Sequence, residues 1–264
     1  MKTNSVIQNS DDQSTRTSIV CRIRNRNEIF ADTIQNWLRF SVSEIIIIDF
    51  RDESCQSVWN VVQELNDPRI KVIETKYEYM FLPATAWNLG ISQVASEFVL
   101  LLDVDNILYE NFFKKNVTAD HEFICGKPKR HLWGSCYCKK AYFDAVNGFN
   151  ENCIYMGYED EDLYNRLVTA GYSMRSYNFS TIHHKDHPKV LTICNQVRQN
   201  GGNAPKIWKS MDSLNRVLAK ELFWTADSPK IQWSLEPLEQ RRLLAIRDVT
   251  CRSVPDSCQT SKTT

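Results

Sequence analysis

The sequence lacks both a long apolar segment and an excess of charge of one sign. No run of residues approaches the ~20 apolar residues that a membrane-spanning helix needs. The 32 Lys and Arg residues balance the 32 Asp and Glu residues, which argues against a general binder of nucleic acid or membrane surfaces. Residues 1–18 are polar and have no apolar core of the kind found in secretory signals. Unless the chain is a piece of a longer protein, we expect a soluble protein of the cytoplasm.

The nine cysteines include no Cys-x-x-Cys pair, and their number is odd. Zinc ribbons and small disulfide-rich domains use tighter and more regular spacings. Mostly reduced cysteines in a cytosol-like compartment are therefore favoured. Cys136 and Cys138 form a close pair, and on a strand they would lie on the same side as small core residues.

Apolar patterning predicts alternating strands and helices between residues 17 and 106. We predict strands in TSIVCRI, EIIIIDF, RIKVIET and EFVLLLDVDN, and helices in IFADTIQNWLRF, CQSVWNVVQEL and LPATAWNLGISQVA. The continuous β-branched run at residues 45–48 is typical of a strand that is buried on both faces of a parallel sheet. This order predicts right-handed βαβ units, and hence an α/β fold with a mostly parallel central sheet flanked by helices.

The pattern changes after residue 111. Shorter strands are expected in HEFICGKPK and LWGSCYCKK, and YSMRSYNFSTIHH is expected to be extended. The helix predicted in EDEDLYNRLVTAG has acids in its first turn and Gly171 as its C-cap. The predicted organisation is a disordered segment at 1–16, an α/β domain at 17–190, a helical extension at 191–252 and a disordered tail at 253–264.

Charged clusters follow three of the predicted strands, in RIRNRNE, DFRDES and DVDN. Ligands of open α/β sheets bind at the carboxyl ends of the strands. A single charged loop after a strand is most often a solvated turn. Because these three loops would lie at one edge of the sheet, together they predict a ligand site.

Carboxylates and histidines in the predicted domain could form a metal site. Asp103 and Asp105, two positions apart at a strand end, could both reach a divalent cation, one of them through water or a sugar hydroxyl. Three of the five histidines, His183, His184 and His187, lie in TIHHKDHP. A carboxylate with an imidazole suits Mn²⁺-like or Zn²⁺-like ions. The alternative is a histidine-rich surface turn before a proline.

Four acids in succession, at residues 159–162, open the last predicted helix of the α/β domain. Acids in the first turn interact favourably with the positive end of the helix dipole, which explains one or two of them. A carboxylate at this position could also deprotonate an acceptor hydroxyl as a general base. Neighbouring like charges raise the pKa of at least one of these acids, which favours that role.

These motifs together resemble the nucleotide-sugar-dependent glycosyltransferases of the GT-A (Rossmann-like) fold, and among them the family 2, β-1,4-galactosyltransferase and bacterial chondroitin-polymerase type. RIRNRNE resembles the loop that holds the nucleotide, and TAWNLGISQVASEFVLLLDVDN resembles the Asn-x-Gly helix that leads into the Asp-x-Asp strand. GFNENCIYMGYEDEDLYNRLVTAGY resembles the acidic helix segment of these enzymes, and TIHHKDH resembles the segment with the late metal-binding His. The resemblance spans residues 18–187.

The resemblance implies a nucleotide-sugar site, a metal site and a pair of catalytic acids. The nucleotide-sugar site would comprise Arg22, Arg24, Arg26, Asp49, Asn88, Asp103 and Val104. Asp105 and His184 would bind Mn²⁺ or Mg²⁺. Asp160 matches the catalytic base of the inverting members, and Glu159 matches an acid that binds the acceptor.

Two positions depart from the pattern of these enzymes. Met156 stands where relatives often have a Trp that stacks on the acceptor, so acceptor stacking at that position is not expected. Thr181 stands where some relatives supply a metal-binding Met, so water would complete the metal shell.

We therefore predict a metal-dependent inverting glycosyltransferase. This hexosyltransferase would move a hexose or N-acetylhexosamine from a UDP-sugar to a hydroxyl of a glycan or glycoconjugate acceptor, with polysaccharide biosynthesis as the expected setting. The donor sugar stays open among Glc, Gal, GlcNAc and GalNAc. The acceptor stays open among a polysaccharide end, a lipid-linked sugar and a protein.

Three alternatives to this prediction stay open. A retaining transferase on the same fold would place the catalytic groups differently around the sugar. A metal-dependent nucleotidyltransferase usually needs a glycine-rich phosphate loop after the first strand, and RNRN contains no glycine. A non-catalytic glycan-binding relative is expected to have lost one of four key residues, all of which are present: Asp103, Asp105, Asp160 and His184.

The segment 206–224 forms the apolar part of the predicted helical extension. Its apolar residues recur at helical spacing: Ile207, Trp208, Met211, Leu214, Val217, Leu218, Leu222 and Phe223. Such a stripe predicts an amphipathic helix. Packing on the domain or on a second copy in a homodimer is favoured over a peripheral contact with a membrane surface.

Overall fold

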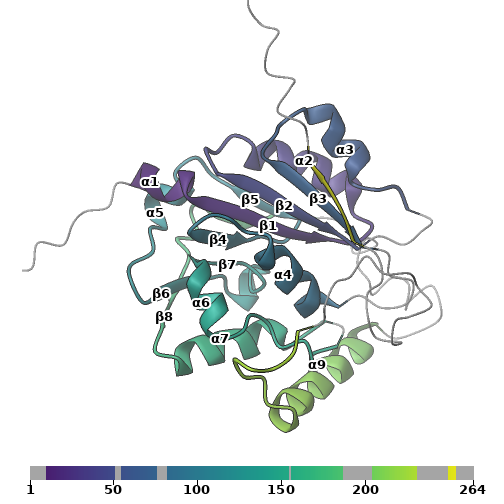
Figure 1. Ribbon diagram of the computed structural model, residues 1–264, viewed down its shortest axis with the longest axis vertical. Helices are drawn as coiled ribbons and strands as arrows, with labels where there is room; N and C mark the ends of the chain where they lie inside the picture. Colours follow the sequence, from purple (N-terminus) through teal and green to yellow (C-terminus); the bar gives the residue numbers. More distant parts are fainter. Residues whose placement is uncertain are drawn as a thin grey trace, which may run out of the picture.

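The computed structural model describes residues 10–50, 55–75, 82–154, 156–186, 204–230 and 249–253. It centres on an eight-stranded sheet with the strand order β10-β3-β2-β1-β4-β7-β6-β8 (Figure 1). The strands are β1 Thr17–Ile23, β2 Glu44–Asp49, β3 Ile70–Thr75, β4 Phe98–Leu101, β6 Glu122–Cys125, β7 Cys136–Lys139, β8 Ser173–Ser176 and β10 Val249–Ser253. Strands β1 to β4 are parallel, as predicted, whereas β7 and β10 run antiparallel to their neighbours.

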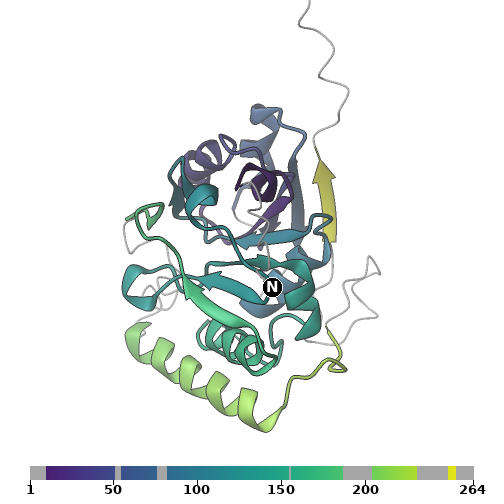
Figure 2. The ribbon, with the colours of Figure 1, turned by 90° about the vertical axis from the view of Figure 1, so that its left-hand side faces the viewer.

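Helices flank both faces of this sheet, as Figures 1 and 2 show. They are α1 Ser10–Thr15, α2 Asn27–Trp37, α3 Trp59–Leu65, α4 Pro83–Ser92, α5 Phe112–Lys115, α6 Lys140–Ala145, α7 Glu159–Thr169 and α9 Ala204–Glu221, with a 3-10 turn, η1, at Pro128–Arg130. Buried side chains of α2, α3 and α5 belong to one hydrophobic core, and those of α4, α6 and α7 belong to the other. The predicted α/β fold with a mostly parallel central sheet is confirmed.

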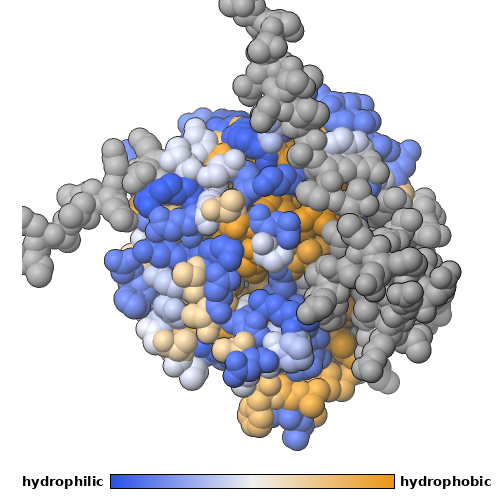
Figure 3. All heavy atoms as spheres, in the orientation of Figure 1, coloured by the Kyte–Doolittle hydropathy of each residue, from blue (hydrophilic) through white to orange (hydrophobic). Residues whose placement is uncertain are grey.

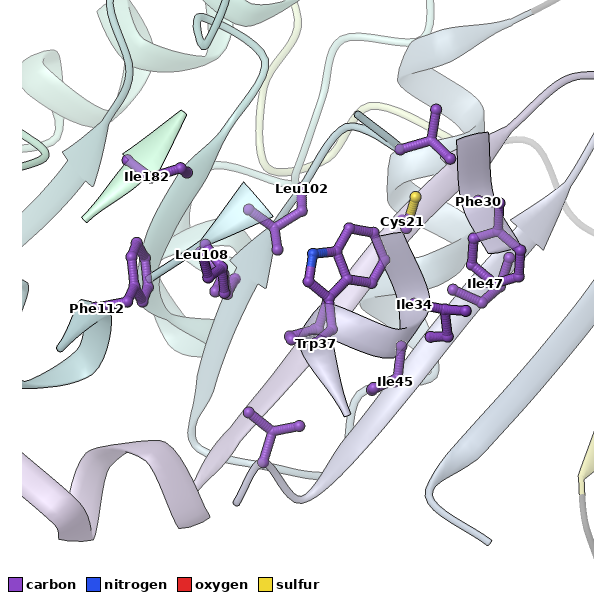
Figure 4. Close-up of a cluster of buried hydrophobic side chains, with 14 of the residues drawn as sticks. Cys21, Phe30, Ile34, Trp37, Ile45, Ile47, Leu102, Leu108, Phe112 and Ile182 are labelled. Carbon is purple, nitrogen blue, oxygen red and sulfur yellow. The ribbon is translucent and has the colours of Figure 1, made fainter. Parts of the chain in front are cut away.

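The isoleucine run of β2 serves both cores. Ile45 and Ile47 lie in the core beneath α2, and Ile46 and Ile48 lie in the core beneath α4. All four are 0% exposed, which explains why no polar residue interrupts the strand. Figure 4 shows the first core, the one beneath α2, with Trp37 of α2 and Ile45 and Ile47 of β2 among its labelled side chains.

A small second sheet extends the carboxyl end of β4. Its strands, β5 (Asn106–Leu108) and β9 (Ile182–His184), are antiparallel. The Trp37 indole N–H donates to the Asn106 carbonyl at 2.9 Å, so α2 anchors β5. The pairing brings β9, which comes much later in the chain, to the segment that follows β4.

The start of the chain is more ordered than its composition predicts. The sequence predicts disorder at residues 1–16, but residues 10–15 form α1. Gln13 is buried, donating from Nε2 to the Thr118 carbonyl at 3.0 Å and accepting at Oε1 from the Thr118 N–H at 3.1 Å. This reciprocal long-range contact orders a polar segment, and composition does not reveal it.

The predicted helical extension at 191–252 contains a helix and also a strand. Among its described residues, α9 is helical, whereas β10 pairs with β3 at the edge of the main sheet. The rest of the extension, and the predicted tail after residue 253, lie outside the described residues. No helix within the described ranges is long and apolar enough to cross a bilayer.

Candidate active site

Asp105 lies between an arginine and a histidine. Its Oδ2 is 3.0 Å from Arg26 Nη1 and 3.5 Å from His184 Nε2. Asp105 itself is only 3% exposed. A hydrogen bond and the charge of Asp105 raise the pKa of His184 above its usual value, although partial burial opposes this shift. An anionic oxygen and an imidazole nitrogen therefore meet at the carboxyl end of β4.

The register of the small sheet explains this meeting. Asn106 of β5 pairs with His184 of β9, which places the histidine next to Asp105. Because side chains alternate along a strand, His183 faces the other way, and its ring stacks on Tyr109 with centroids 5.1 Å apart. The structure thus brings His184, rather than its neighbour, to the carboxylate.

Arg22 joins acids from two distant segments. Its Nη2 lies 3.9 Å from Asp103 Oδ1 and 3.6 Å from Glu159 Oε1. The guanidinium also lies over the ring of Trp87, 4.7 Å from its centroid, in a cation–π contact. A cation from the end of β1 therefore links the acid that follows β4 with the acid that begins α7.

Asp160, the next residue of α7, forms no ion pair with any described residue. Its Oδ1 is sealed from solvent and has no hydrogen-bond partner in the described part of the chain, although the residue as a whole is partly exposed. Desolvation raises the pKa of Asp160 well above its usual value, and the charges of Glu159 and Asp103 raise it further, against the opposing effect of Arg22. A raised pKa brings a carboxylate nearer to the pH at which a general base works best.

Glu159 and Asp103 complete a cluster of carboxyl groups around a single guanidinium. Glu159 Oε2 accepts a hydrogen bond from the Gly157 N–H at 2.6 Å. Desolvation raises the pKa of Glu159 and of Asp103, and Arg22 opposes both shifts. Because Asp103 and Glu159 share one guanidinium and Asp160 has no ion pair among the described residues, this edge of the sheet can take up protons or a further cation.

Gly134 is a site residue that the sequence analysis missed. A Cβ atom at this position would lie 2.6 Å from Asp103 Oδ2, so the backbone between η1 and β7 closes directly onto that carboxylate. The isolated glycine in LWGSC was the available sequence signal, because a glycine in or next to a strand often marks a place where other groups approach the backbone closely.

Three of the residues predicted to bind the nucleotide-sugar, Asp49, Asn88 and Val104, have side chains that contact the rest of the protein. Asp49 Oδ2 accepts from the Val58 N–H at 3.0 Å and so holds the start of α3. Asn88 donates to the Phe149 carbonyl at 2.9 Å and accepts from the Phe149 N–H at 2.8 Å. The side chain of Val104 lies in the core beneath α2, so only its backbone could meet a ligand. The first two side chains hold loops that border the site.

A pocket of about 300 Å³ opens between the loops that follow β1 and β2. Its lining comprises Asn25, Arg26, Asn27, Glu28, Ile29, Cys55 and Gln56. Asn27 Nδ2 donates to the Gln56 carbonyl at 2.7 Å and ties the two loops together. Arg26 connects the pocket with Asp105, and Arg24 lies partly buried in the same loop. An extended ligand could run from this pocket to the carboxylates.

The side chains of Asp105 and His184 fit a metal ion that takes its remaining coordinating atoms from a bound ligand or water. In the described part of the chain, no group of three or more His, Cys, Asp or Glu residues is arranged to hold a metal. Asp105 and His184 supply one oxygen and one nitrogen, a set that suits Mn²⁺. Mg²⁺ is likewise often held by one or two carboxylates together with water and substrate phosphates. His187, another candidate, lies outside the described residues.

Part of the chain matches a known protein family. A family model described as the N-terminal domain of galactosyltransferase matches residues 126–189, from the start of the loop that contains η1 to the segment just after β9. No curated protein sequence matches the chain.

Solved structures with the same fold cover most of the chain. GalNAc-T7 with UDP, GalNAc and Mn²⁺ has a TM-score of 0.56 at 11% identity, over 80% of this chain and 55% of that one. Mannosyltransferase PcManGT from Pyrobaculum calidifontis, in complex with GDP-Man and Mn²⁺, has a TM-score of 0.54 at 13% identity, over 77% and 69%. The catalytic domain of Drosophila β1,4-galactosyltransferase 7, in complex with xylobiose, has a TM-score of 0.50 at 15% identity, over 67% and 73%.

These comparisons confirm the predicted resemblance to GT-A nucleotide-sugar glycosyltransferases. At such low identities the structures establish a shared fold, and that fold is GT-A. The family match falls on the second half of the same domain, where α7 and β9 supply Glu159, Asp160 and His184. Both findings agree with the predicted class of enzyme, a glycosyltransferase.

Proposed function

We propose that the protein is a metal-dependent inverting glycosyltransferase that moves a hexose or N-acetylhexosamine from a UDP-sugar to a hydroxyl of a glycan or glycoconjugate. The observation that carries the proposal is the position of the Asp105–His184 pair and the acids of α7 around Arg22 and Asp103, at one edge of the sheet. These groups come from segments far apart in the chain, and this arrangement of oxygen, nitrogen and guanidinium groups suits a sugar diphosphate.

The donor nucleotide would lie along the loop after β1. The residues proposed to contact the nucleotide-sugar are Arg22, Arg24, Arg26, Asp49, Asp103 and Val104, the last through its backbone. Guanidinium groups bind phosphate oxygens with two parallel hydrogen bonds, which favours the arginines as partners of the diphosphate. Asn88 would act on the donor through the loop at Phe149 that it holds.

Mn²⁺ is the favoured ion, with Mg²⁺ as the alternative. The structures of PcManGT and GalNAc-T7 contain Mn²⁺. In this chain Asp105 and His184 would hold the ion, and Asp103 would bind the donor sugar or the water ligands of the metal. When bound, the ion neutralises charge that develops on the departing diphosphate.

Asp160 would act as the general base. It would take the proton from the acceptor hydroxyl while that oxygen attacks the anomeric carbon from the face opposite the diphosphate. Attack from this face inverts the anomeric configuration. Glu159, fixed by the Gly157 N–H, would bind and orient the acceptor.

Nucleotide release tests the proposal directly. The protein would be incubated with UDP-Glc, UDP-Gal, UDP-GlcNAc, UDP-GalNAc or GDP-Man, in Mn²⁺, Mg²⁺ or a chelator. We expect metal-dependent release of UDP from a UDP-sugar, with loss of release in Asp105→Asn. A nucleotidyltransferase would instead release pyrophosphate when given UTP and a sugar 1-phosphate, and sugar binding without turnover would identify a glycan-binding protein.

A retaining transferase is the second candidate, because the fold itself does not fix the stereochemistry. NMR of the anomeric proton in freshly formed product distinguishes the two mechanisms. An anomeric configuration opposite to that of the donor supports Asp160 as the base. The same configuration as the donor would assign the protein to the retaining class.

Assembly and location are proposed separately from the chemistry. Leu214, Val217, Leu222 and Phe223 are exposed at and just beyond α9, and Figure 3 shows hydrophobic surface at the end of the molecule where Figure 1 places α9. We favour a homodimer through this strip over contact with a membrane surface, in a cytoplasmic enzyme. Sedimentation with and without anionic vesicles distinguishes the two partners of the strip.

A further inference from the structure

Helix α9 turns a polar face toward the loop that leads into α7, and Figures 1 and 2 both show the two helices side by side. Asn215 is 0% exposed, whereas Leu214 and Val217 of the same helix are 44% and 54% exposed. An amphipathic helix that packs on a domain normally buries its apolar residues instead. Polar contacts at Asn215 therefore help to hold α9 on the domain.

Asn215 bonds the backbone at two points of the loop. Its Oδ1 accepts from the Ile154 N–H at 2.9 Å, and its Nδ2 donates to the Gly157 carbonyl at 2.6 Å. A buried amide that uses both ends in this way fixes the two backbone positions relative to each other. Asn215 thus sets the shape of the loop just before the acids of α7.

The loop that Asn215 holds ends in a strained turn. Gly157 has a φ of +107° and Tyr158 a φ of +72°, both in the left-handed region. A bulky residue keeps such a conformation only when its surroundings hold it there. Arg216 lies over the Tyr158 ring, 4.4 Å from its centroid, and donates two hydrogen bonds to Glu161 at 2.9 and 2.8 Å. Neighbouring residues of α9 therefore hold both residues of the turn.

The same turn positions an acid of the candidate active site. The carbonyl of Gly157 accepts from Asn215, and the N–H of Gly157 donates to Glu159 Oε2 at 2.6 Å. Glu159 in turn lies 3.6 Å from Arg22. A continuous series of contacts thus runs from α9 to the centre of the site. The family match ends at residue 189, so α9 lies beyond it.

We infer that Asn215 is a positioning residue of the active site and that α9 is part of the catalytic unit. Asn215 holds the turn at residues 157–158 so that Glu159 faces the acceptor and Asp160 stands beside it. The inference rests on the proposed function, because acceptor binding by Glu159 is the property that Asn215 would control. Arg26 and Asp105 lie outside this series of contacts, at the ends of β1 and β4 and beside β9, so binding of UDP with the metal should depend on α9 much less than acceptor binding does.

Asn215→Ala tests this separation, with Ser213→Ala, an exposed position on the same helix, as the matched control. We expect kcat/KM for the acceptor to fall at least about tenfold in Asn215→Ala, the size of effect that a small misplacement of substrate-binding groups produces. The Kd of UDP in Mn²⁺ should change by less than about twofold in both variants, as for substitutions outside a binding site. Arg216→Lys removes the paired hydrogen bonds from a half-exposed position and should give a smaller loss in the same parameter.

Amide hydrogen exchange over residues 153–161 provides a readout that is independent of activity. We expect faster exchange at Gly157 and Glu159 in Asn215→Ala and unchanged exchange in Ser213→Ala. Unchanged exchange and acceptor kinetics in Asn215→Ala would overturn the inference, as would an equal loss of UDP affinity. If Asn215→Ala does not fold, the acceptor kinetics of Arg216→Lys decide in its place. If the wild-type protein transfers no sugar but exchange changes as expected, the proposed function fails, and Asn215 is shown to hold the turn at residues 157–158 without a role in acceptor binding.

Discussion

Two aspartates at one sheet edge have opposite surroundings. Asp105 has nitrogen partners at 3.0 Å on Arg26 and 3.5 Å on His184. Asp160 has no ion pair among the described residues, and its sealed Oδ1 has no hydrogen bond there. Nearby cations favour an ionised carboxylate, whereas desolvation and like charges favour a protonated one. We therefore propose that this edge of the sheet binds a cation at Asp105 and accepts a proton at Asp160.

Asp160→Asn removes the proposed proton acceptor and should have the largest effect on sugar transfer. We expect the rate of sugar transfer to fall about 10³-fold, within the range for loss of a general base. UDP affinity in Mn²⁺ should stay unchanged because Asp105 and His184 are intact. Asp144→Asn makes the same chemical change on the exposed surface of α6 and should transfer sugar normally. Normal transfer in Asp160→Asn would contradict its assignment as the base.

The same Asp160→Asn variant should be more stable than the wild type at neutral pH. The pKa of Asp160 is higher in the folded chain than the value of ~3.9 for a free aspartate. As the pH rises past the lower, unfolded value, the unfolded chain releases its proton first, so this group costs the folded state stability. The neutral asparagine carries no such cost, and Tm at pH 7 should rise. At pH 3 the difference in Tm should shrink.

Asp105→Asn and His184→Ala each remove a proposed metal ligand and should have the next largest effect. Loss of a metal ligand should weaken Mn²⁺-dependent UDP binding by more than the roughly 10- to 100-fold that a change beyond the ligand shell costs. Calorimetric titration of UDP with and without Mn²⁺ measures this loss. Asp32→Asn, which changes an exposed partner of Lys185, is the control. Equal Mn²⁺-dependent affinity in all four proteins would remove the metal site from these residues.

Gly134→Ala tests the position of Asp103, which neighbours both aspartates in the cluster of charges. The new Cβ would lie 2.6 Å from Asp103 Oδ2, so the carboxylate must shift, and kcat/KM for the donor should fall about tenfold. Stability should change little because the displaced atom is the end of a side chain. Gly171→Ala should instead lower stability and leave activity normal. The φ of Gly171 is +94°, so an alanine there should reduce the free energy of unfolding by roughly 1 kcal/mol.

Arg22→Gln should displace the pH profile of sugar transfer, in addition to any loss of donor binding. Arg22 lowers the pKa of Asp160 and of Glu159, so its removal should raise both. Because the base must be ionised to act, activity should fall at a higher pH than in the wild type as the solution is acidified. The pH dependence of kcat/KM measures the shift, and Arg39→Gln, at an exposed ion pair, should leave it unchanged. A shift to lower pH would contradict the charge arrangement.

The sequence predicts the parallel half of the fold well because burial there leaves a direct pattern. The run at 45–48 can only be apolar throughout, since its residues enter two cores in alternation. The antiparallel direction of β7 has no such signature, because Cys136–Lys139 would look the same in either orientation. The strand β10 and the contact of Gln13 with Thr118 depend on partners far away in the sequence.

The candidate site likewise contains features with a local sequence pattern and features that depend on residues far away in the chain. The position of Asp103 and Asp105 after an apolar strand is visible locally, and the resemblance indicates His184. The pairing of β5 with β9, which selects His184 over His183, is three residues long and too short to predict. The burial of Asn215 is also unpredictable, because the apolar spacing of α9 indicates that Leu214 and Val217 should face the domain, whereas both are exposed.

Crystals grown with UDP and Mn²⁺ offer the most direct test of the proposal that one sheet edge holds a cation site and a separate proton acceptor. Anomalous scattering from manganese locates the ion without assumptions about its ligands. We expect one strong peak bound by Asp105 and His184, with Asp160 outside its coordination shell. A peak coordinated by Asp160, or one with neither Asp105 nor His184 among its ligands, would contradict it.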